Sequence, residues 1–558
     1  MKNNKQNLFH KMSRFKPLII LLVLLCGTQS CEDTLTEEVI TDIGNDYINS
    51  PVGFEDAVKG AYSYLRSYYA QEMGMTMTQM GTDTYSHGAD GSYKRYDLYA
   101  SDLDGRDNWV NTLWREFYRG INTCNAVIGR GPNIEGIDAE TLKTRIAEVK
   151  ALRAQYYFVL VQHYGGLDLR LEETGGPITA VTRSTEEEVY TQIIKDYNEA
   201  LADLPTSSPW GRYNKMAVEA MLCKVHITRA TRSFGTTDDF AQAEKYGKNV
   251  INNYDRALVS DYSELFELGN DENSEAVFAI QFSYDLLTAG GYGNRWHLYY
   301  LMEYDTQPGM SRVLEVGRPW KRLKPTDYTY NTVFANRVDD ARYEKSFRQV
   351  FNATRSGTFS TSLDDSKAEV TFEVGDTAIF MPGYEMSFEE RAKRPYQVYT
   401  PSMYQLKQFG VLSKFLDPLR ASINEVQGGR DFNVVRLGDV YLTVAEALIK
   451  QNKADEAVNF INPIRRRAAY PGHEAEMEIT AADATMDFIY DERARELLGE
   501  GHRWTDLKRW GNLVERVKKY NPTGMDGIAE KHNYRPIPQS QIDLVDGGNA
   551  SFPQNPGY

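Results

Sequence analysis

The chain has few cysteines and lacks a second long apolar run. Only four of its 558 residues are cysteine. Two of them, Cys124 and Cys223, fall in amphipathic helical patterns, which favours buried thiols over a disulfide. The one marked apolar run, Leu18–Leu25, is too short to span a bilayer as a permanent helix. The composition therefore predicts a large domain whose core, and not disulfides, carries its stability.

Excess positive charge is also lacking. Lysine and arginine number 63 against 78 aspartate and glutamate residues, which gives a formal net charge of −15. Neutralising phosphates requires a basic face, so nucleic acid is excluded as a partner. Polyanionic substrates are disfavoured as well, although a local basic patch would still allow uronic acids to bind.

Catalytic and cofactor motifs are missing. The sequence has no His-Glu-x-x-His, Gly-x-Ser-x-Gly or Cys-x-x-Cys pattern, and Gly290–Gly293 lacks the spacing of a dinucleotide fingerprint. Asp102–Gly105 starts like a calcium loop, but Arg106 takes the next ligand position and Leu113 stands where the closing glutamate belongs. We expect no enzyme activity, cofactor or metal. Glycosidase activity remains an alternative, because it needs only two carboxylates at the correct distance and a sequence does not give that distance.

The amino end has the pattern of a lipoprotein signal peptide over residues 1–30. A positive n-region precedes the apolar run, and small residues stand among those before Cys31. We expect Cys31 to carry the lipid chains, palmitate among them, ahead of an acidic tether over residues 31–50. Glu32 and Asp33 resemble the acidic tag of surface-exported bacterial lipoproteins, which indicates the outer face of a cell outer membrane. Ordinary secretion is the alternative, because Gln29 fits a lipobox poorly.

Hydrophobic periodicity predicts a mainly α fold. Alanines and other apolar residues recur at helical spacing in four pairs of helices. The predicted pairs cover residues 54–69 with 109–127, 142–163 with 184–204, 215–232 with 240–252, and 438–447 with 454–467. They resemble tetratricopeptide repeats, which bury their faces only against one another. Between the third and fourth pairs, residues 255–430 are rich in Gly, Tyr, Pro and charge, and we expect irregular structure there.

Three motifs near the carboxyl end occur together and in order: Asp491–Gly511, Tyr534–Pro538 and Gln554–Tyr558. Within the first, Glu492 and Glu496 sit at helical spacings that allow charge pairing, beside an apolar stripe. The combination closely resembles the carboxyl-terminal signature of the SusD/RagB family of surface glycan-binding lipoproteins. The resemblance implies an α-α superhelix of four repeat-like pairs packed against a loop-rich half with a few short strands. We divide the chain after residue 50 into an amino-terminal region, 51–320, and a carboxyl-terminal region, 321–558.

Two loop regions combine aromatic rings with groups that form several hydrogen bonds, as sugar recognition requires. The candidate ligand contacts in the first region are Asp83, Tyr85, Tyr93, Tyr96, Arg106, Asn108 and Trp109. Those in the second region are Trp296, Tyr299 and Trp320.

Each candidate also has a structural reading. Trp109 stands at the start of a predicted helix and would stabilise that end of it. Trp296 and Trp320 would fit a hydrophobic core as well as a surface on which a ligand stacks. Asp83 would equally cap a turn. Adjacent Tyr299 and Tyr300 cannot both face one side of an extended segment.

The resemblance implies a function. A member of this family would capture an oligosaccharide or polysaccharide without cleaving it and pass it to a SusC-like TonB-dependent transporter, acting as the lid of its barrel. The alternative is a peptide-binding lid of a RagAB-like peptide importer, because aromatic loops with several arginines serve either ligand.

Overall fold

The computed structural model describes residues 45–91, 93–285, 287–288 and 291–558. The chain divides into two units, Met1–Ile48 and Asn49–Tyr558. In the first unit the structure describes α2 (Asn45–Ile48). Everything below concerns the second unit. The predicted division at residue 320 stays a prediction.

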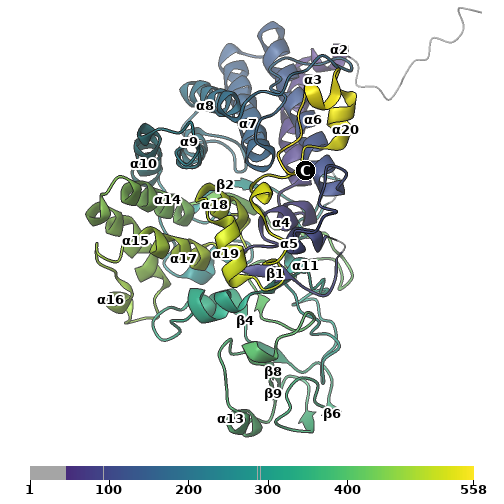
Figure 1. The fold of residues 1–558 in the computed structure, drawn as a ribbon, viewed down its shortest axis with the longest axis vertical. Coiled ribbons are helices and arrows are strands. Elements are labelled where there is room, and N and C mark those ends of the chain that lie inside the picture. The colour runs from purple at the N-terminus through teal and green to yellow at the C-terminus, as the bar shows by residue number, and fades with distance from the viewer. Residues whose placement is uncertain (1–44, 92, 286, 289–290) are drawn as a thin grey trace, which may run out of the picture. The chain divides into compact units, whose positions relative to one another are not determined.

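Four helix pairs form the predicted superhelix (Figure 1). The helices are α3 (Pro51–Ser63) with α6 (Asn108–Arg130), α7 (Ala139–Tyr164) with α8 (Glu186–Asp203), α9 (Lys215–Arg229) with α10 (Thr237–Asn252), and α14 (Leu437–Lys450) with α15 (Ala454–Ala468). The prediction of four pairs is confirmed. Several helix ends differ from the predicted ones by about three residues. The largest difference is in the first predicted helix, which ends at Ser63 and continues as the 3₁₀ turn η1 (Tyr64–Ser67).

Capping side chains explain where these helices begin. Thr185 opens α8 with a capping box: its hydroxyl accepts from the Glu188 N–H at 3.2 Å, and its own N–H donates to the Glu188 carboxylate at 2.7 Å. Asp138 and Asn214 cap α7 and α9 in the same way with one side-chain acceptor each. Such caps satisfy backbone donors that a helix leaves free, and they fix the first turn.

The third and fourth pairs pack directly although about 190 residues separate them in sequence. Helix α10 lies against α14, and Gly247 stands at the crossing. A Cβ atom at Gly247 would lie 2.2 Å from Val444 Cγ2 and 3.1 Å from Cys223 Sγ. Close approach of the two helices therefore requires glycine at this position.

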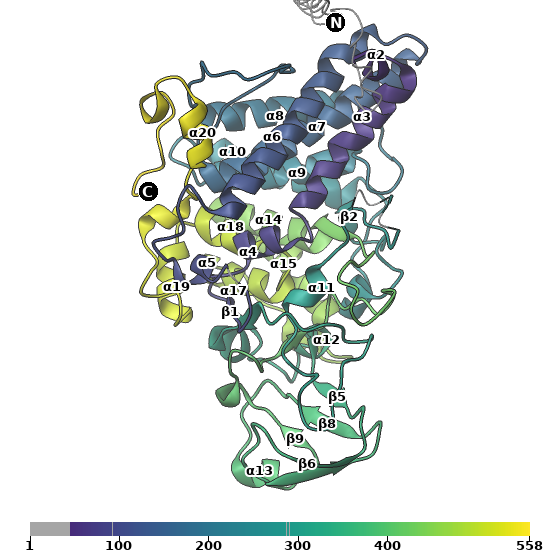
Figure 2. The ribbon, with the colours of Figure 1, turned by 90° about the vertical axis from the view of Figure 1, so that its right-hand side faces the viewer.

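The insertion between these pairs starts and ends in one two-stranded sheet. Strand β2 (Ala276–Ile280) pairs antiparallel with β11 (Phe432–Arg436), so the intervening chain leaves and returns at the same place. As predicted, it is mostly irregular. Figures 1 and 2 both place its strands β6 (Gly357–Ser360), β8 (Thr377–Phe380) and β9 (Gln397–Val398) and helix α13 (Phe388–Ala392) at the end of this unit opposite α6, α7 and α8.

The remaining elements are short. The other strands are β1 (Tyr85–His87), β3 (Leu323–Pro325), β4 (Phe347–Arg348), β5 (Val350–Asn352), β6 (Gly357–Ser360), β7 (Glu369–Phe372), β8 (Thr377–Phe380), β9 (Gln397–Val398) and β10 (Val411–Leu412). The other α-helices are α4 (Glu72–Thr78), α5 (Arg95–Leu98), α11 (Trp296–Tyr299), α12 (Arg342–Ser346), α13 (Phe388–Ala392), α16 (Glu474–Met477), α17 (Met486–Glu496), α18 (Arg503–Arg509), α19 (Leu513–Tyr520) and α20 (Gln539–Leu544).

A buried ionic network joins the helical pairs to the insertion. Glu496 at the end of α17 is fully buried, and its carboxylate contacts three arginines, Arg342 at 3.0 Å, Arg436 at 2.7 Å and Arg467 at 2.5 Å. Burial favours the neutral acid, but the three guanidinium groups outweigh it and lower the pKa of Glu496 to about 2. These arginines come from α12, β11 and α15, so one carboxylate holds three distant segments together.

We predict that Glu496→Gln, which keeps the shape and removes the charge, lowers the free energy of unfolding by about 3 to 5 kcal/mol, because it leaves buried guanidinium charge uncompensated. Urea denaturation followed by circular dichroism measures this. The control is Glu478→Gln, which breaks a surface ion pair with Arg466 and should cost less than about 1 kcal/mol. Equal effects of the two substitutions would contradict the role assigned to Glu496.

Candidate ligand-binding surface

A short sheet brings the two predicted loop regions together. Strand β1 pairs antiparallel with β3, and Tyr85 lies opposite Pro325 while His87 lies opposite Leu323. The chain that follows β1 and the chain that precedes β3 therefore leave the sheet at the same end. Beyond the ladder, the Gly88 N–H donates to the Arg322 carbonyl at 2.8 Å. The Lys321 ammonium pairs with Asp90 at 3.1 Å. Segments some 230 residues apart thus lie side by side.

The first part of this surface lies at the start of α6. Tyr93 stacks on Trp109 with a centroid separation of 4.5 Å and an interplanar angle of 33°. Trp109 is held by Asp107, whose carboxylate caps the helix by accepting from the Trp109 N–H at 2.8 Å and also from the Tyr96 hydroxyl at 2.6 Å. Tyr93 and Trp109 are half-buried, and Arg106 and Asn108 beside them are exposed.

The second part centres on Trp320, which is also half-buried. Its ring packs against Tyr299 at 5.7 Å, and the guanidinium of Arg322 lies 5.1 Å from its centroid. Arg322 is in turn fixed by Glu72 at 2.7 Å. Burial raises the pKa of Glu72, and Arg322 opposes that shift. A ring with a cation held beside it is a rigid platform for a flat ligand.

We define the aromatic surface as six residues: Tyr93, Arg106, Asn108, Trp109, Trp320 and Arg322. It offers aromatic faces for stacking together with guanidinium and amide donors for hydroxyl groups. Such a combination suits a sugar ring, which has an apolar face and a rim of hydroxyls. Five of the ten predicted ligand contacts belong to this surface.

For the other five residues the predicted ligand contact is wrong. Asp83, Tyr85, Tyr96, Trp296 and Tyr299 are all 0 or 1% exposed, so their side chains do not reach solvent. The residue pattern predicts rings and acceptors in these loops, but it does not distinguish a ring that faces outward from one that fills the core under the loop.

Two of the five show what these side chains do instead. The Asp83 carboxylate forms ion pairs with Arg503 at 2.6 Å and with Arg516 at 2.7 Å, which tie the loop to α18 and α19. Trp296 is in the core and donates its indole N–H to the Gly499 carbonyl at 2.9 Å. Both residues therefore support the surface from below.

Glu72 and Arg322 were missed by the sequence reasoning. For Arg322 the only signal was its position two residues after Trp320; the alternation of an extended strand does not apply, because Lys321 between them has a φ of 44°. Nothing in the local sequence indicated Glu72, because its place beside Arg322 arises from packing between α4 and the insertion.

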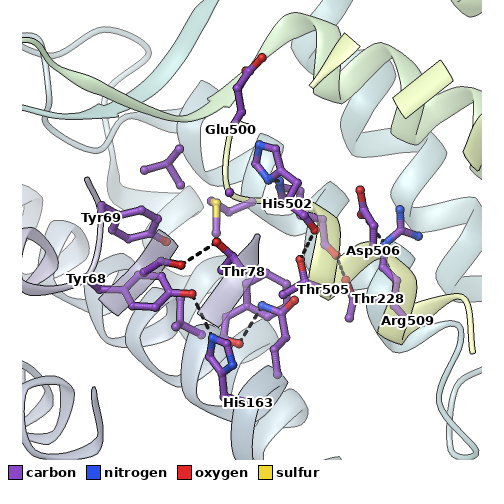
Figure 3. Close-up of a pocket in the computed structure, with 18 of the residues that line it drawn as sticks. Tyr68, Tyr69, Thr78, His163, Thr228, Glu500, His502, Thr505, Asp506 and Arg509 are labelled. Atoms are coloured by element: carbon purple, nitrogen blue, oxygen red, sulfur yellow. Dashed lines mark hydrogen bonds and ion pairs between the residues drawn. The ribbon is translucent and has the colours of Figure 1, made fainter. Parts of the chain in front are cut away.

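A separate cavity of about 80 Å³ lies inside the protein, between α4, α7, α9 and α18 (Figure 3). Tyr68 and His163 face each other across one side, with the tyrosine oxygen 3.0 Å from His163 Nε2. Its two carboxylates are both ion-paired, Glu500 with Arg436 at 2.7 Å and Asp506 with Arg493 at 2.9 Å. The volume suits a few water molecules, and neither carboxylate is available as a general base.

The geometry defines the class of the chain. It is a tetratricopeptide-like helical-repeat protein in which loops from two distant segments adjoin beside β1 and β3, and each loop carries partly exposed rings. Among the residues that the structure describes, no cluster of three or more histidine, cysteine or acidic side chains could hold a metal ion.

The chain belongs to the SusD family. Residues 240–558, more than half of the chain, match the model of the SusD family. Residues 39–227 match a second model, described as starch-binding associating with outer membrane.

Three relatives illustrate the similarity. SusD-like protein P25 of Formosa agariphila is 24% identical over 98% of this chain and 100% of its own length. The starch-binding protein SusD of Bacteroides thetaiotaomicron is 26% identical over 75% of this chain and 74% of its own. A solved laminarin-binding SusD-like protein superposes with a TM-score of 0.67 at 21% identity, covering 91% of this chain and all of that one. None of the three is named as an enzyme, in agreement with the prediction that this chain is not one.

The predicted lipid anchor, Cys31, and the signal peptide lie outside the described residues. Within the described part of the chain, no helix is both long and apolar enough to cross a membrane.

We predict that stability falls as the pH is lowered from about 7 to about 4, partly through His502 on the cavity wall. Burial and the neighbouring Lys224 ammonium, 3.4 Å from Nδ1, lower the pKa of His502 to about 4. The folded state therefore binds fewer protons than the unfolded state between that value and the ordinary histidine pKa of about 6.5. The stabilisation is complete above about pH 6.5 and is lost toward pH 4, on the order of 2 kcal/mol.

Urea denaturation at pH 7, 5.5 and 4.5 measures this dependence. His502→Gln should flatten it, whereas Val338→Ala, at an exposed side chain with no ionisable group, should leave it as steep as in the wild type. The interpretation would be wrong if both variants kept the wild-type dependence.

Proposed function

We propose that the chain captures a glycan on its aromatic surface at the outside of the cell and passes it on uncleaved. The observation that carries this proposal is a set of partly exposed rings: Tyr93 stacked on Trp109, and Trp320 with the Arg322 guanidinium beside it. Two relatives named for binding starch and laminarin support the ligand class.

The surface is suited to modest affinity. Few rings stack, and the donors around them are partly solvated, so a dissociation constant in the micromolar to millimolar range is expected, about 4 to 8 kcal/mol. Release is then fast enough for transfer. A ligand held much more tightly would obstruct delivery.

The recipient in this proposal is a SusC-like TonB-dependent transporter of the outer membrane. The chain would act as the lid of its barrel and trap the sugar between the two proteins. The helical pairs offer a broad rigid face for the contact with the transporter, while Cys31 would tether the lid to the membrane. Membership of the SusD family supports this arrangement.

Isothermal titration against laminarihexaose, maltohexaose and a panel of other neutral and acidic glycans tests the ligand class. Trp320→Ala and Trp109→Ala should each weaken binding by about tenfold or more, because they remove a stacking face. The matched control is Tyr384→Ala, at an exposed tyrosine of the insertion outside the aromatic surface. Wild-type affinity in both tryptophan variants would refute the assignment of the surface.

Trp296→Ala gives a second contrast. Since this ring is in the core, its loss should lower the free energy of unfolding by about 3 to 5 kcal/mol. If no glycan binds and heat is released only with peptide mixtures, the chain is instead the peptide-binding lid of a RagAB-like importer.

We predict that Cys31→Ala abolishes incorporation of radiolabelled palmitate when the gene is expressed in a bacterium of the Bacteroidetes type, and that the protein moves to the soluble fraction. Cys26→Ala, at the other cysteine of the amino end, should still be labelled. If the Cys31→Ala variant is still labelled, another residue carries the lipid and the prediction is wrong.

A further inference from the structure

A second, larger groove lies on the solvent side of α6. It is bounded by α6, by the segment 168–179 that connects α7 toward α8, and by α20, and its volume is about 630 Å³. Figures 1 and 2 both show α20 beside α6, and the Ser540 hydroxyl of α20 donates to the Asn111 amide oxygen of α6 at 2.7 Å. The volume is in the range of ligand-binding pockets.

The wall opposite α6 is fixed at both ends. At one end the Thr174 N–H and hydroxyl donate to the Asn122 side-chain oxygen at 2.8 and 2.9 Å. At the other end the Thr179 carbonyl accepts from the Asp546 N–H at 2.9 Å. Between them lie Gly175 and Gly176, where an added Cβ atom would meet open space. The groove is therefore a formed feature with anchored walls.

Two rings lie at the floor of the groove: Trp114, which is 6% exposed, and Tyr118, which is partly exposed. Trp114 and Tyr118 stack with a centroid separation of 4.8 Å and an interplanar angle of 31°. The Tyr118 hydroxyl donates to the Asp168 carbonyl at 2.7 Å, which fixes the ring. Hydroxyl and amide side chains, Thr123 and Gln541 among them, surround this floor. Rings with hydroxyl and amide neighbours suit a carbohydrate better than a purely apolar ligand.

The charge of the lining is opposite to that of the chain. Arg115, Arg119 and Arg170 line the groove, although the whole protein carries −15. Its one acidic lining residue, Asp168, pairs with Arg170 at 2.6 Å, so the remaining positive charge is that of Arg115 and Arg119. The side chains of Arg115 and Arg119 are 55 and 58% exposed. Both contact the Glu116 carboxylate through one nitrogen, so each guanidinium keeps further N–H donors for a ligand. This is a local basic patch in an acidic protein.

We propose that this groove binds a carboxylated oligosaccharide, such as a uronic acid oligomer. The guanidinium groups would donate paired hydrogen bonds to the carboxylates, and the exposed part of the Tyr118 ring would contact a sugar face. The site goes beyond the proposed function, since none of its residues belongs to the aromatic surface. It would let the protein hold an acidic chain while the aromatic surface holds another part of it or a different glycan.

Titration of the mature protein with hexagalacturonate tests this inference, and fully methyl-esterified hexagalacturonate is the matched neutral ligand. The double variant Arg115→Ala, Arg119→Ala should weaken hexagalacturonate binding by at least about tenfold, the loss of one or two charge-assisted hydrogen bonds. Arg466→Ala, at a surface arginine paired with Glu478, is the control and should bind as the wild type does. Binding should also weaken with added salt.

The outcomes separate the two sites. Trp320→Ala should leave hexagalacturonate binding unchanged, whereas the arginine double variant should leave neutral glycan binding unchanged. The inference is overturned if the wild type does not bind hexagalacturonate at millimolar concentration, if the methyl ester binds equally well, or if the double variant binds as the wild type does. Binding of hexaglutamate at this groove with the same loss in the double variant would overturn the carbohydrate assignment in favour of an acidic peptide.

Discussion

The structure depends on a set of charges that are out of contact with water. Taking a carboxylate such as Glu496 into the interior costs several kcal/mol, and the cost is offset only if cations meet it in good geometry. Arg342, Arg436 and Arg467 do so, and each comes from a different part of the chain. The helical pairs and the insertion must therefore come together around α17 before the network is satisfied, which makes the two halves of the unit interdependent.

The same kind of interaction reaches the aromatic surface. Asp83 is bound by Arg503 and Arg516, so the loop that follows α4 is fixed to the carboxyl-terminal signature. Asp107 does the equivalent at the start of α6, where it caps the helix that presents Trp109. The rings that face solvent are thus held by buried ions and caps beneath them, and a ligand would meet a surface that needs little ordering.

Helix α6 contributes to both candidate sites. Its first turn carries Trp109 on the aromatic surface, and the turns that follow carry Trp114, Arg115 and Tyr118 along the groove. A long helix packed on one face against α3 and α7 is a rigid support, so the two sites keep a fixed separation. An extended glycan with neutral and acidic parts would match such a pair of sites, because two weak contacts on a rigid support act together.

Helix positions, their caps and the four pairs could be predicted from the sequence because they depend on local periodicity and on side chains such as Thr185 that act within one turn. The ordered motifs from Asp491 to Tyr558 also established the family. Which rings face solvent could not be predicted: Trp296 and Trp320 look alike in sequence, yet one fills the core and the other remains half-exposed. That choice depends on contacts between segments more than two hundred residues apart, such as β1 with β3, and only the tertiary structure decides it.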